Sequence, residues 1–238
     1  HQGTALAIVP VLLRNEIIGL LEVYDDAPGR QFSQEDISLL DSIALQAANA
    51  IENARLFAQT QRTLVQTQTL HQISRALAAG LDEQVTFETV LGEYLKLLNL
   101  DQGSLMLYDQ ATGANVARAR YIDGQPVEPK LVLAQQQDLI YKTLCEQPVP
   151  LVIDRPKTNP LTKEHKQTRG QHKATAMLVI PLVMRDKIAG SLVIDATRPG
   201  YVFGQNETEL GQSIADQLII WLENRRLLAE TRQRSELL

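Results

Sequence analysis

The sequence predicts an α+β protein in which helices pack on one face of an antiparallel sheet and long helices flank the domains. Three observations lead to this prediction. The chain contains an internal repeat, each copy reads as a hairpin followed by a long helix, and helices and strands alternate between the copies. The 238 residues are 44% hydrophobic and 21% charged, which is typical of globular proteins and excludes a disordered chain.

Composition also limits the compartment and the partners. The single cysteine excludes an intrachain disulfide and a thiolate-based zinc site, and it is compatible with a reducing compartment. No apolar run reaches the roughly 18–20 residues that span a bilayer, so we expect no membrane insertion. The net charge of −5 argues against nucleic acid as a partner. We therefore expect a cytoplasmic protein.

The internal repeat relates residues 5–62 to residues 176–233, without a gap and at a constant offset of 171 positions. A match of this length indicates duplicated domains rather than a solenoid. Each copy reads as strand, two-residue turn, strand, loop and long helix. The first strand of each copy is a continuous apolar run, which is typical of a strand covered on both faces: Leu6–Leu13 and Met177–Met184. The second strands are Ile17–Val23 and Ile188–Ile194.

Particular residues mark the boundaries within each copy. Gly19 and Gly190 lie inside the second strand, where they predict a bulge or a close approach of another backbone. Ser33 is the expected N-cap of the helix in the first copy.

Both long helices carry apolar residues at a spacing of three and four. We expect their first halves to pack on their own sheets, and the parts beyond Ala58 and Leu227 to form a coiled-coil homodimer.

The residues before the second copy complete a domain. Asp82 is the expected cap of a helix at 83–98, after a break at Gly80. The other expected elements are helices at 70–79 and 135–146, strands at 103–108, 116–122 and 149–153, and a loop at 155–173. The sequence thus predicts four parts: the C-terminal part of a truncated domain (1–60), a connecting helix (61–79), a complete domain (80–227) and the start of a linker to an output domain (228–238).

Three segments carry a resemblance to a known family. They are LHQISRALAAGLDEQVTFETVLGEYLKLLNLDQGSLMLYDQATGA, EQPVPLVID with the following RPKTNP, and AMLVIPLVMRDKIAGSLVIDA with the helix start FGQNETEL. In this order and spacing they resemble the GAF family of small-molecule sensor domains over residues 70–230, and residues 5–60 resemble the end of a preceding GAF domain. The resemblance implies a six-stranded antiparallel sheet with a ligand pocket under loops on the face opposite the helices. It also implies a larger signalling protein, such as a sensor histidine kinase of a two-component system.

Some members of the family bind a bilin or reduce a sulfoxide, and each of these activities needs particular residues. Bilin-binding members attach the chromophore through a cysteine between the fourth strand and the last hairpin. Cys145 instead precedes that strand, on a helix where we expect a small core residue, so a covalent bilin is not expected and the cofactor stays unknown. Neither the several cysteines of the sulfoxide-reducing members nor a nucleophile–base pair is present. We therefore expect a non-catalytic module.

The loop at 155–173 resembles the lid of the family's pocket, and it is rich in lysine and arginine. A cationic lid would favour an anionic ligand such as a nucleotide or carboxylate, whereas the alternative is a solvated surface loop. Asp154 could contact the ligand or cap the following turn. The spacing of the two histidines matches no standard metal site. The candidate ligand-binding residues in this region are Asp154, Arg155, His165, Arg169 and His172.

The floor of the pocket supplies the remaining candidates. From the first hairpin of the complete domain these are Tyr108, Arg118, Arg120 and Tyr121, and from the last hairpin Ile180 and Leu192. Arg118 and Arg120 are expected on one strand face because side chains alternate, and that face could point to ligand or to water. Taken together, the sequence predicts a sensory module that binds a small ligand and relays it through a helical dimer. The alternative is a structural dimerisation or spacer module without a ligand.

Overall fold

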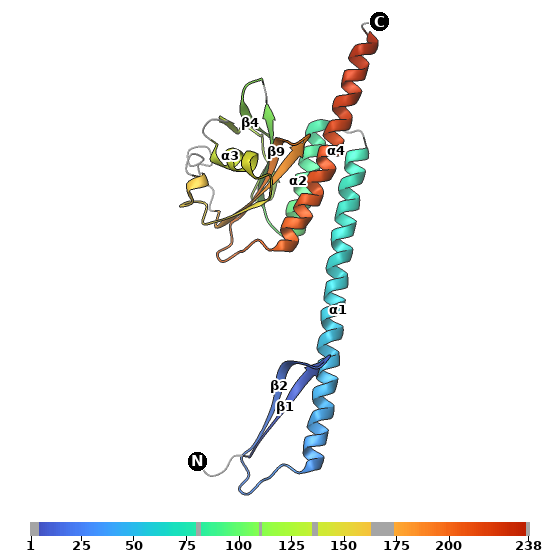
Figure 1. Cartoon of the computed structure of the whole chain (residues 1–238), viewed down its shortest axis with the longest axis vertical. Helices are drawn as coiled ribbons and strands as arrows, with labels where there is room; N and C mark the ends of the chain where they lie inside the picture. Colours follow the sequence, from blue (N-terminus) through green and yellow to red (C-terminus); the bar gives the residue numbers. More distant parts are fainter. Residues whose placement is uncertain (1–4, 80–81, 110, 135–137, 163–173, 237–238) are drawn as a thin grey trace. The chain divides into compact units, whose positions relative to one another are not determined.

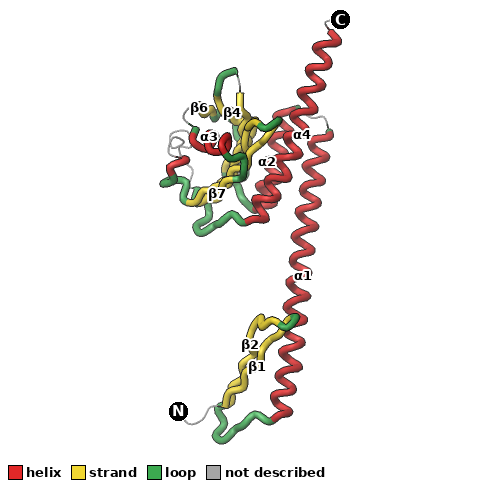
Figure 2. The backbone as a smooth tube through the Cα atoms, in the orientation of Figure 1, coloured by secondary structure: helices red, strands yellow, loops and turns green. Residues whose placement is uncertain are grey.

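The computed structural model describes residues 5–79, 82–109, 111–134, 138–162 and 174–236 (Figures 1 and 2). The chain divides into two compact units, His1–Leu64 and Val65–Leu238. None of the described helices carries an apolar stretch long enough to cross a membrane.

The first unit is a β-hairpin packed on a helix. Strands β1 (Ala5–Leu13) and β2 (Glu16–Asp25) are antiparallel, and the chain then enters α1 (Gln34–Ala78), whose last turns belong to the second unit. Ser33 caps α1 as expected. Its hydroxyl accepts a hydrogen bond from the Asp36 amide at 3.1 Å, and its own amide donates to the Asp36 carboxylate at 2.8 Å.

Only one face of the first hairpin is covered in this unit. Ala7, Val9 and Val11 of β1 pack against Leu40, Ala44 and Ala48 of α1. The intervening side chains of β1 are exposed, with Leu6 and Ile8 each 49% accessible. The prediction that both faces of this strand are covered is therefore wrong for β1, although it holds for the corresponding strand of the second unit.

The second unit contains an antiparallel sheet of seven strands in the order β5-β4-β3-β9-β8-β7, with β6 also paired to β4. The strands are β3 (Gln102–Asp109), β4 (Ala114–Ile122), β5 (Gln125–Pro126), β6 (Val132–Ala134), β7 (Leu151–Asp154), β8 (Ala176–Met184) and β9 (Lys187–Ala196). The predicted antiparallel sheet is confirmed. The strands β5 and β6 were not predicted from the sequence, because strands of two or three residues are too short to show an alternation of apolar and polar side chains.

Helices cover both faces of this sheet. The end of α1, α2 (Glu83–Leu98) and α4 (Gln205–Glu236) lie against one face, as predicted, and the short α3 (Leu139–Glu146) lies against the other (Figure 1). The N-cap of α2 is Asp82, as expected, whose carboxylate accepts from the Gln84 amide at 2.8 Å. Helix α3 begins at Leu139 rather than at residue 135, because the Asp138 carboxylate caps it by accepting from the Tyr141 amide.

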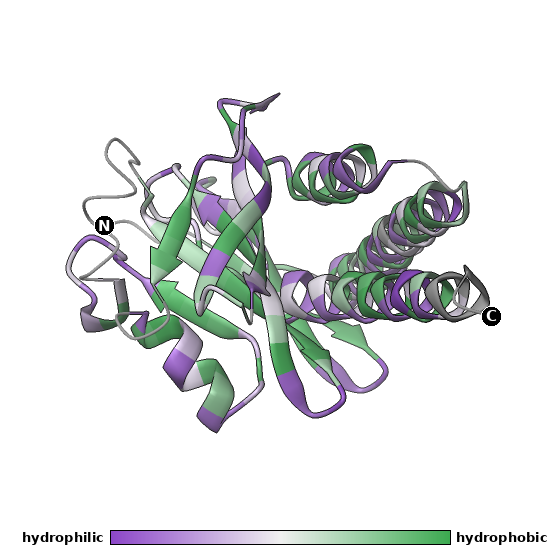
Figure 3. Ribbon diagram, turned by 90° about the horizontal axis from the view of Figure 1, so that it is seen from above, coloured by the Kyte–Doolittle hydropathy of each residue, from purple (hydrophilic) through white to green (hydrophobic). Residues whose placement is uncertain are grey.

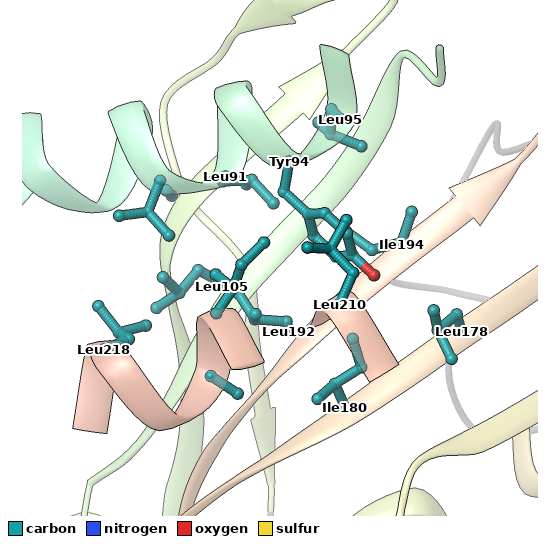
Figure 4. Packing of buried hydrophobic residues seen from close by; sticks show 14 of the residues in the cluster. Leu91, Tyr94, Leu95, Leu105, Leu178, Ile180, Leu192, Ile194, Leu210 and Leu218 are labelled. Atoms are coloured by element: carbon teal, nitrogen blue, oxygen red, sulfur yellow. The ribbon is translucent and has the colours of Figure 1, made fainter. Parts of the chain in front are cut away.

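The helix-side core, the apolar cluster between the sheet and α1, α2 and α4, holds the second unit together. Side chains of α2 and α4 meet those of β3, β8 and β9 there (Figure 4). One polar group enters this core: the Tyr94 hydroxyl of α2 donates to the Glu207 carbonyl of α4 at 2.7 Å, and burial raises the pKa of Tyr94. The strands are coloured largely hydrophobic and the turns hydrophilic in Figure 3, as burial of the sheet requires.

The two repeated glycines occupy equivalent places but different surroundings. Both lie beside an irregularity in strand pairing, between Val11 and Leu12 in the first unit and between Leu182 and Val183 in the second. A Cβ atom on Gly190 would overlap the Met106 carbonyl oxygen, whereas one on Gly19 would lie 3.9 Å from the Cβ of Val11. The predicted close approach of a backbone is therefore confirmed at Gly190, where β3 passes alongside.

Candidate functional site

A small cavity lies on the opposite side of the sheet, between β3, β4, β9 and the N-terminal end of α3. Its volume is about 30 Å³, which is room for one or two water molecules. Five apolar side chains form part of its wall: Met106, Leu131, Leu133, Ile140 and Val193. Seven polar side chains also line it: Gln102, Ser104, Asn115, Arg120, Asp138, Ser191 and Asp195.

Buried polar side chains gather at this cavity. Five residues at the cavity are each less than 9% accessible, and they make up five of the eight buried polar or charged side chains in the described part of the chain: Gln102, Asn115, Asp138, Ser191 and Asp195. Burying a polar side chain costs free energy unless it has hydrogen-bond partners. The concentration of such side chains on one face therefore identifies this cavity as the candidate ligand site.

Strand pairing determines which side chains reach the cavity. Gln102 of β3 is opposite Asp195 of β9, and Ser104 of β3 is opposite Arg120 of β4. Residues opposite each other in antiparallel strands point to the same face. Arg120 and Asp195 therefore enter the cavity from the two strands that flank β3.

The N-cap of α3 supplies the second carboxylate. Asp138 accepts a hydrogen bond from the Asn115 amide nitrogen of β4 at 2.8 Å and another from the Tyr141 backbone amide at 3.1 Å. These two bonds fix the orientation of the carboxylate and tie α3 to the sheet. The cavity thus contains one guanidinium and two carboxylates, with amide and hydroxyl groups between them.

The two arginines predicted from the first hairpin do not share a face. Leu105 pairs with Ala119, but the next residue, Met106, pairs with Ala117, so Arg118 is the additional residue of a bulge. A bulge interrupts the alternation of side chains along a strand. As a result Arg120 lines the cavity, whereas Arg118 is exposed and is not among the cavity residues.

Of the two predicted tyrosines, Tyr121 lines the cavity and Tyr108 does not. Tyr121 borders the cavity, but its hydroxyl packs against α2, where a Cβ atom on Gly92 would lie 2.6 Å from it. Burial raises the pKa of Tyr121. Tyr108 stacks on Tyr141 of α3 with 4.9 Å between ring centroids, and it is not among the cavity residues.

Ile180 and Leu192, predicted for the floor of the pocket, point the other way, into the helix-side core (Figure 4). Their strand neighbours Val179, Ser191 and Val193 face the α3 side. A shift of one residue exchanges the two faces of a strand. The uninterrupted apolar run of β8 contains no alternation from which its two faces could be distinguished.

The predicted lid contributes little to the described cavity. Asp154 and Arg155 are exposed and do not line it. His165, Arg169 and His172 lie outside the described residues. Cys145 is exposed on α3, so the prediction of a small core residue is wrong, and Leu144 beside it fills the core instead.

The five buried polar residues of the cavity were not predicted from the sequence: Gln102, Asn115, Asp138, Ser191 and Asp195. Two of them had a usable signal, because Ser191 and Asp195 are polar residues within an otherwise apolar strand. Asp138 becomes a cavity residue only through its role as a cap. Among the described residues, no three His, Cys, Asp or Glu side chains come together as metal ligands.

Comparison with known proteins identifies the fold. A family model described as GAF domain matches residues 1–51 and 82–220. The GAF domain of a phosphoenolpyruvate-protein phosphotransferase from Coxiella burnetii superposes with a TM-score of 0.60 and 22% sequence identity, covering 70% of this chain and 98% of that chain.

Two further solved structures are similar to this chain. The phycocyanobilin-bound GAF domain of a cyanobacterial phytochrome has a TM-score of 0.57 and 17% identity, covering 68% of this chain and 96% of that chain. A methyl-accepting chemotaxis protein has a TM-score of 0.55 and 16% identity, covering 66% of this chain and 98% of that chain. At these identities the similarity shows a shared fold.

Proposed function

The chain belongs to the GAF domain family, and from this premise we propose that its second unit is a sensory module that binds a small ligand in the cavity beneath α3. The module is regulatory rather than catalytic. Structures of the same fold come from a phosphotransferase, a phytochrome and a chemotaxis protein, which supports a role within a larger cytoplasmic signalling protein.

The observation that carries this proposal is the set of five buried polar side chains on the cavity side of the sheet. The internal repeat strengthens it. Facing the helices, Leu192 and Ile194 correspond to Leu21 and Val23 of the first unit, so these positions stay apolar. At the cavity, Ser191 and Asp195 correspond to Leu20 and Tyr24. The repeat thus keeps the residues that build the fold and changes those that line the cavity.

We propose that strand β9 connects the cavity to α4 within the second unit. Strand β9 carries Ser191 and Asp195 to the cavity, and the turn that precedes it carries Arg185, which donates to Glu223 of α4 at 2.8 Å. For occupancy to change α4, the ligand must bind one arrangement of sheet and helix better than the other. A difference of about 1–3 kcal/mol is typical of such coupling.

The proposed output is a homodimer whose helices respond to occupancy. Leu227 and Leu228 of α4 are exposed beyond the part of the helix that packs on the sheet. Ile220, which is 60% accessible, lies one heptad before Leu227, and apolar residues at this spacing are typical of a helix–helix seam.

A spacer module without a ligand is the second candidate, and the small cavity volume favours it. About 30 Å³ admits little more than water, and the bond from Asn115 already satisfies part of the Asp138 carboxylate. In that case the polar side chains would serve only to bind internal water and each other.

The Ser191→Leu variant distinguishes the two candidates, because it places the residue of the first unit in the cavity. A panel of small metabolites is screened by thermal shift against the full chain and the variant. The sensory proposal predicts a ligand that stabilises the original protein and not Ser191→Leu. The matched control is Lys187→Glu, an exposed residue of β9 that also takes the first unit's residue and should respond like the original. A ligand that stabilises all three proteins equally, or no ligand at all, would favour the spacer.

A further inference from the structure

The outer edge of strand β2 indicates a docking site for a further strand. We propose that β2 binds an antiparallel β-strand along this edge, as β9 binds β3 in the second unit, and that the added strand comes from a part of the same polypeptide that precedes the hairpin. This inference concerns the first unit and does not depend on a ligand in the cavity of the second.

Strand β2 pairs on one side only. Among the described residues it pairs with β1 and with no other strand (Figure 2), whereas its counterpart β9 lies between β8 and β3. Proteins protect such edges with proline, lysine or a short strand. Strand β1 contains Pro10, which has no N–H to donate. Strand β2 has 10 residues and contains neither proline nor lysine, so its edge is open to pairing.

Gly19 marks the place where the added strand would pass. Its counterpart Gly190 is opposite Leu107 of β3, and a Cβ atom there would overlap the Met106 carbonyl oxygen. A Cβ atom on Gly19 would meet only Val11, at 3.9 Å. Glycine weakens the interior of a strand, and it often marks a close approach of another backbone. The repeat therefore keeps space at Gly19 for a carbonyl group that the described residues of the first unit do not supply.

The face of the hairpin that points away from α1 is apolar. Leu6 and Ile8 of β1 are each 49% accessible, and Leu20 of β2 is 58% accessible. The counterparts of the first two, Met177 and Val179, are fully buried in the core beneath α3. Contiguous exposed apolar side chains mark contact surfaces. A strand added to β2 would extend this face, so we expect its side chains on this side to be apolar.

The pairing of β3 with β9 specifies the register. Residues 102–107 of β3 are opposite residues 190–195 of β9. At the offset of 171 positions, the added strand would run along β2 from Gly19 to Tyr24. Strand β3 precedes β9 in the chain. We expect the same order for the added strand, because both units carry the same repeat.

A synthetic peptide with the sequence of residues 102–109 is the probe, because this strand occupies the equivalent edge of the second unit. It is either added to the full chain or joined in front of residue 1 through a flexible Gly/Ser linker, which raises its effective concentration. Hydrogen exchange followed by mass spectrometry measures the amides from Gly19 to Tyr24. Without the peptide they should exchange faster than those of residues 190–195, and the joined peptide should slow them by about tenfold or more.

Gly19→Ala should abolish the added protection, because its Cβ atom would occupy the place of the peptide carbonyl. Glu22→Ala is the matched control. It introduces the same side chain on the same strand, at a position where Val193 of β9 carries a side chain beside β3, so it should keep the protection. Circular dichroism checks that both variants are folded.

Equal protection in Gly19→Ala and the original protein would overturn the proposal, as would no protection of β2 by either form of the peptide. Protection by the added peptide but not by the joined one would overturn an origin within the same polypeptide. Protection of β2 that appears without the peptide and rises with protein concentration would place a second copy of the chain at this edge instead.

Discussion

Arg185, in the turn between β8 and β9, donates a hydrogen bond from Nε to the Glu223 carboxylate of α4 at 2.8 Å. One repeat earlier, Arg14 donates to Glu52 of α1 at 3.1 Å. Both arginines have left-handed backbones, with φ of 51° and 50°. The same ion pair therefore joins the hairpin turn to the following helix in both units. The side chains of Arg185 and Glu223 are 58% and 34% accessible, and surface pairs of this kind contribute about 0.2–1 kcal/mol. A pair this weak, present twice, is better explained by a role in positioning the helix.

Reversing the Arg185–Glu223 pair tests that role. Arg185→Glu should change the overall stability by no more than about 1 kcal/mol, but it should reduce amide-exchange protection in the part of α4 around Glu223. The double variant Arg185→Glu/Glu223→Arg should restore the protection, because the opposite charges meet again. Arg226→Gln is the control, since its pair with Glu230 lies within α4. Failure of the double variant to recover protection would show that the charges do not hold the helix.

The two repeated glycines predict opposite outcomes for one substitution. Gly190→Ala places a Cβ atom against the Met106 backbone and should destabilise the second unit by about 1–3 kcal/mol, the usual cost of overpacking. Gly19→Ala, the matched control, meets only an ordinary contact with Val11 and should be close to neutral. Thermal unfolding followed by circular dichroism compares the two. Equal losses would mean that the close approach of β3 is not what requires glycine.

The Tyr94 hydroxyl links α2 to α4 in the helix-side core. Tyr94→Phe removes its bond to the Glu207 carbonyl and should cost about 1 kcal/mol in the second unit. Urea unfolding followed by fluorescence of Trp221, the single tryptophan of the chain, measures this unit. Tyr108→Phe, which keeps the ring stacked on Tyr141, should change the midpoint less.

The same tyrosine predicts a dependence on alkaline pH. Burial raises the pKa of Tyr94 in the folded protein above its unfolded value of about 10. The unfolded state therefore loses the proton first, and the stabilisation that is complete below about pH 10 declines as the pH rises further. The original protein should lose stability in this range faster than Tyr94→Phe. Parallel decline of the two proteins would contradict the assignment.

Leu228 lies at the proposed dimer interface on α4. It is 61% accessible on α4, and Leu228→Lys should convert the proposed dimer to a monomer, because a lysine ammonium is costly to bury in an apolar seam. Light scattering coupled to size exclusion measures the mass. Leu6→Lys, an exposed apolar residue on the hairpin of the first unit, should leave the dimer intact. The opposite pattern would place the interface on the first unit.

Sequence patterns predicted the elements better than the faces they present. The repeat, the cap at Asp82 and the backbone approach at Gly190 follow from residue type alone, and the structure confirms them. Arg118 and Ile180 show the limit. A single bulge residue separated Arg118 from Arg120, and an unbroken apolar strand did not reveal that Ile180 faces the helices. Asp138 was missed because its place in the cavity depends on where α3 begins, which its own side chain determines.

The central claim is that the second unit holds a small molecule in the cavity beneath α3. Native mass spectrometry of the full chain, repeated under denaturing conditions and with Ser191→Leu, tests it most directly. We expect a noncovalent added mass on the native protein, absent after denaturation and absent from the variant. A native protein that carries no added mass, even after incubation with the metabolite panel, would contradict this proposal.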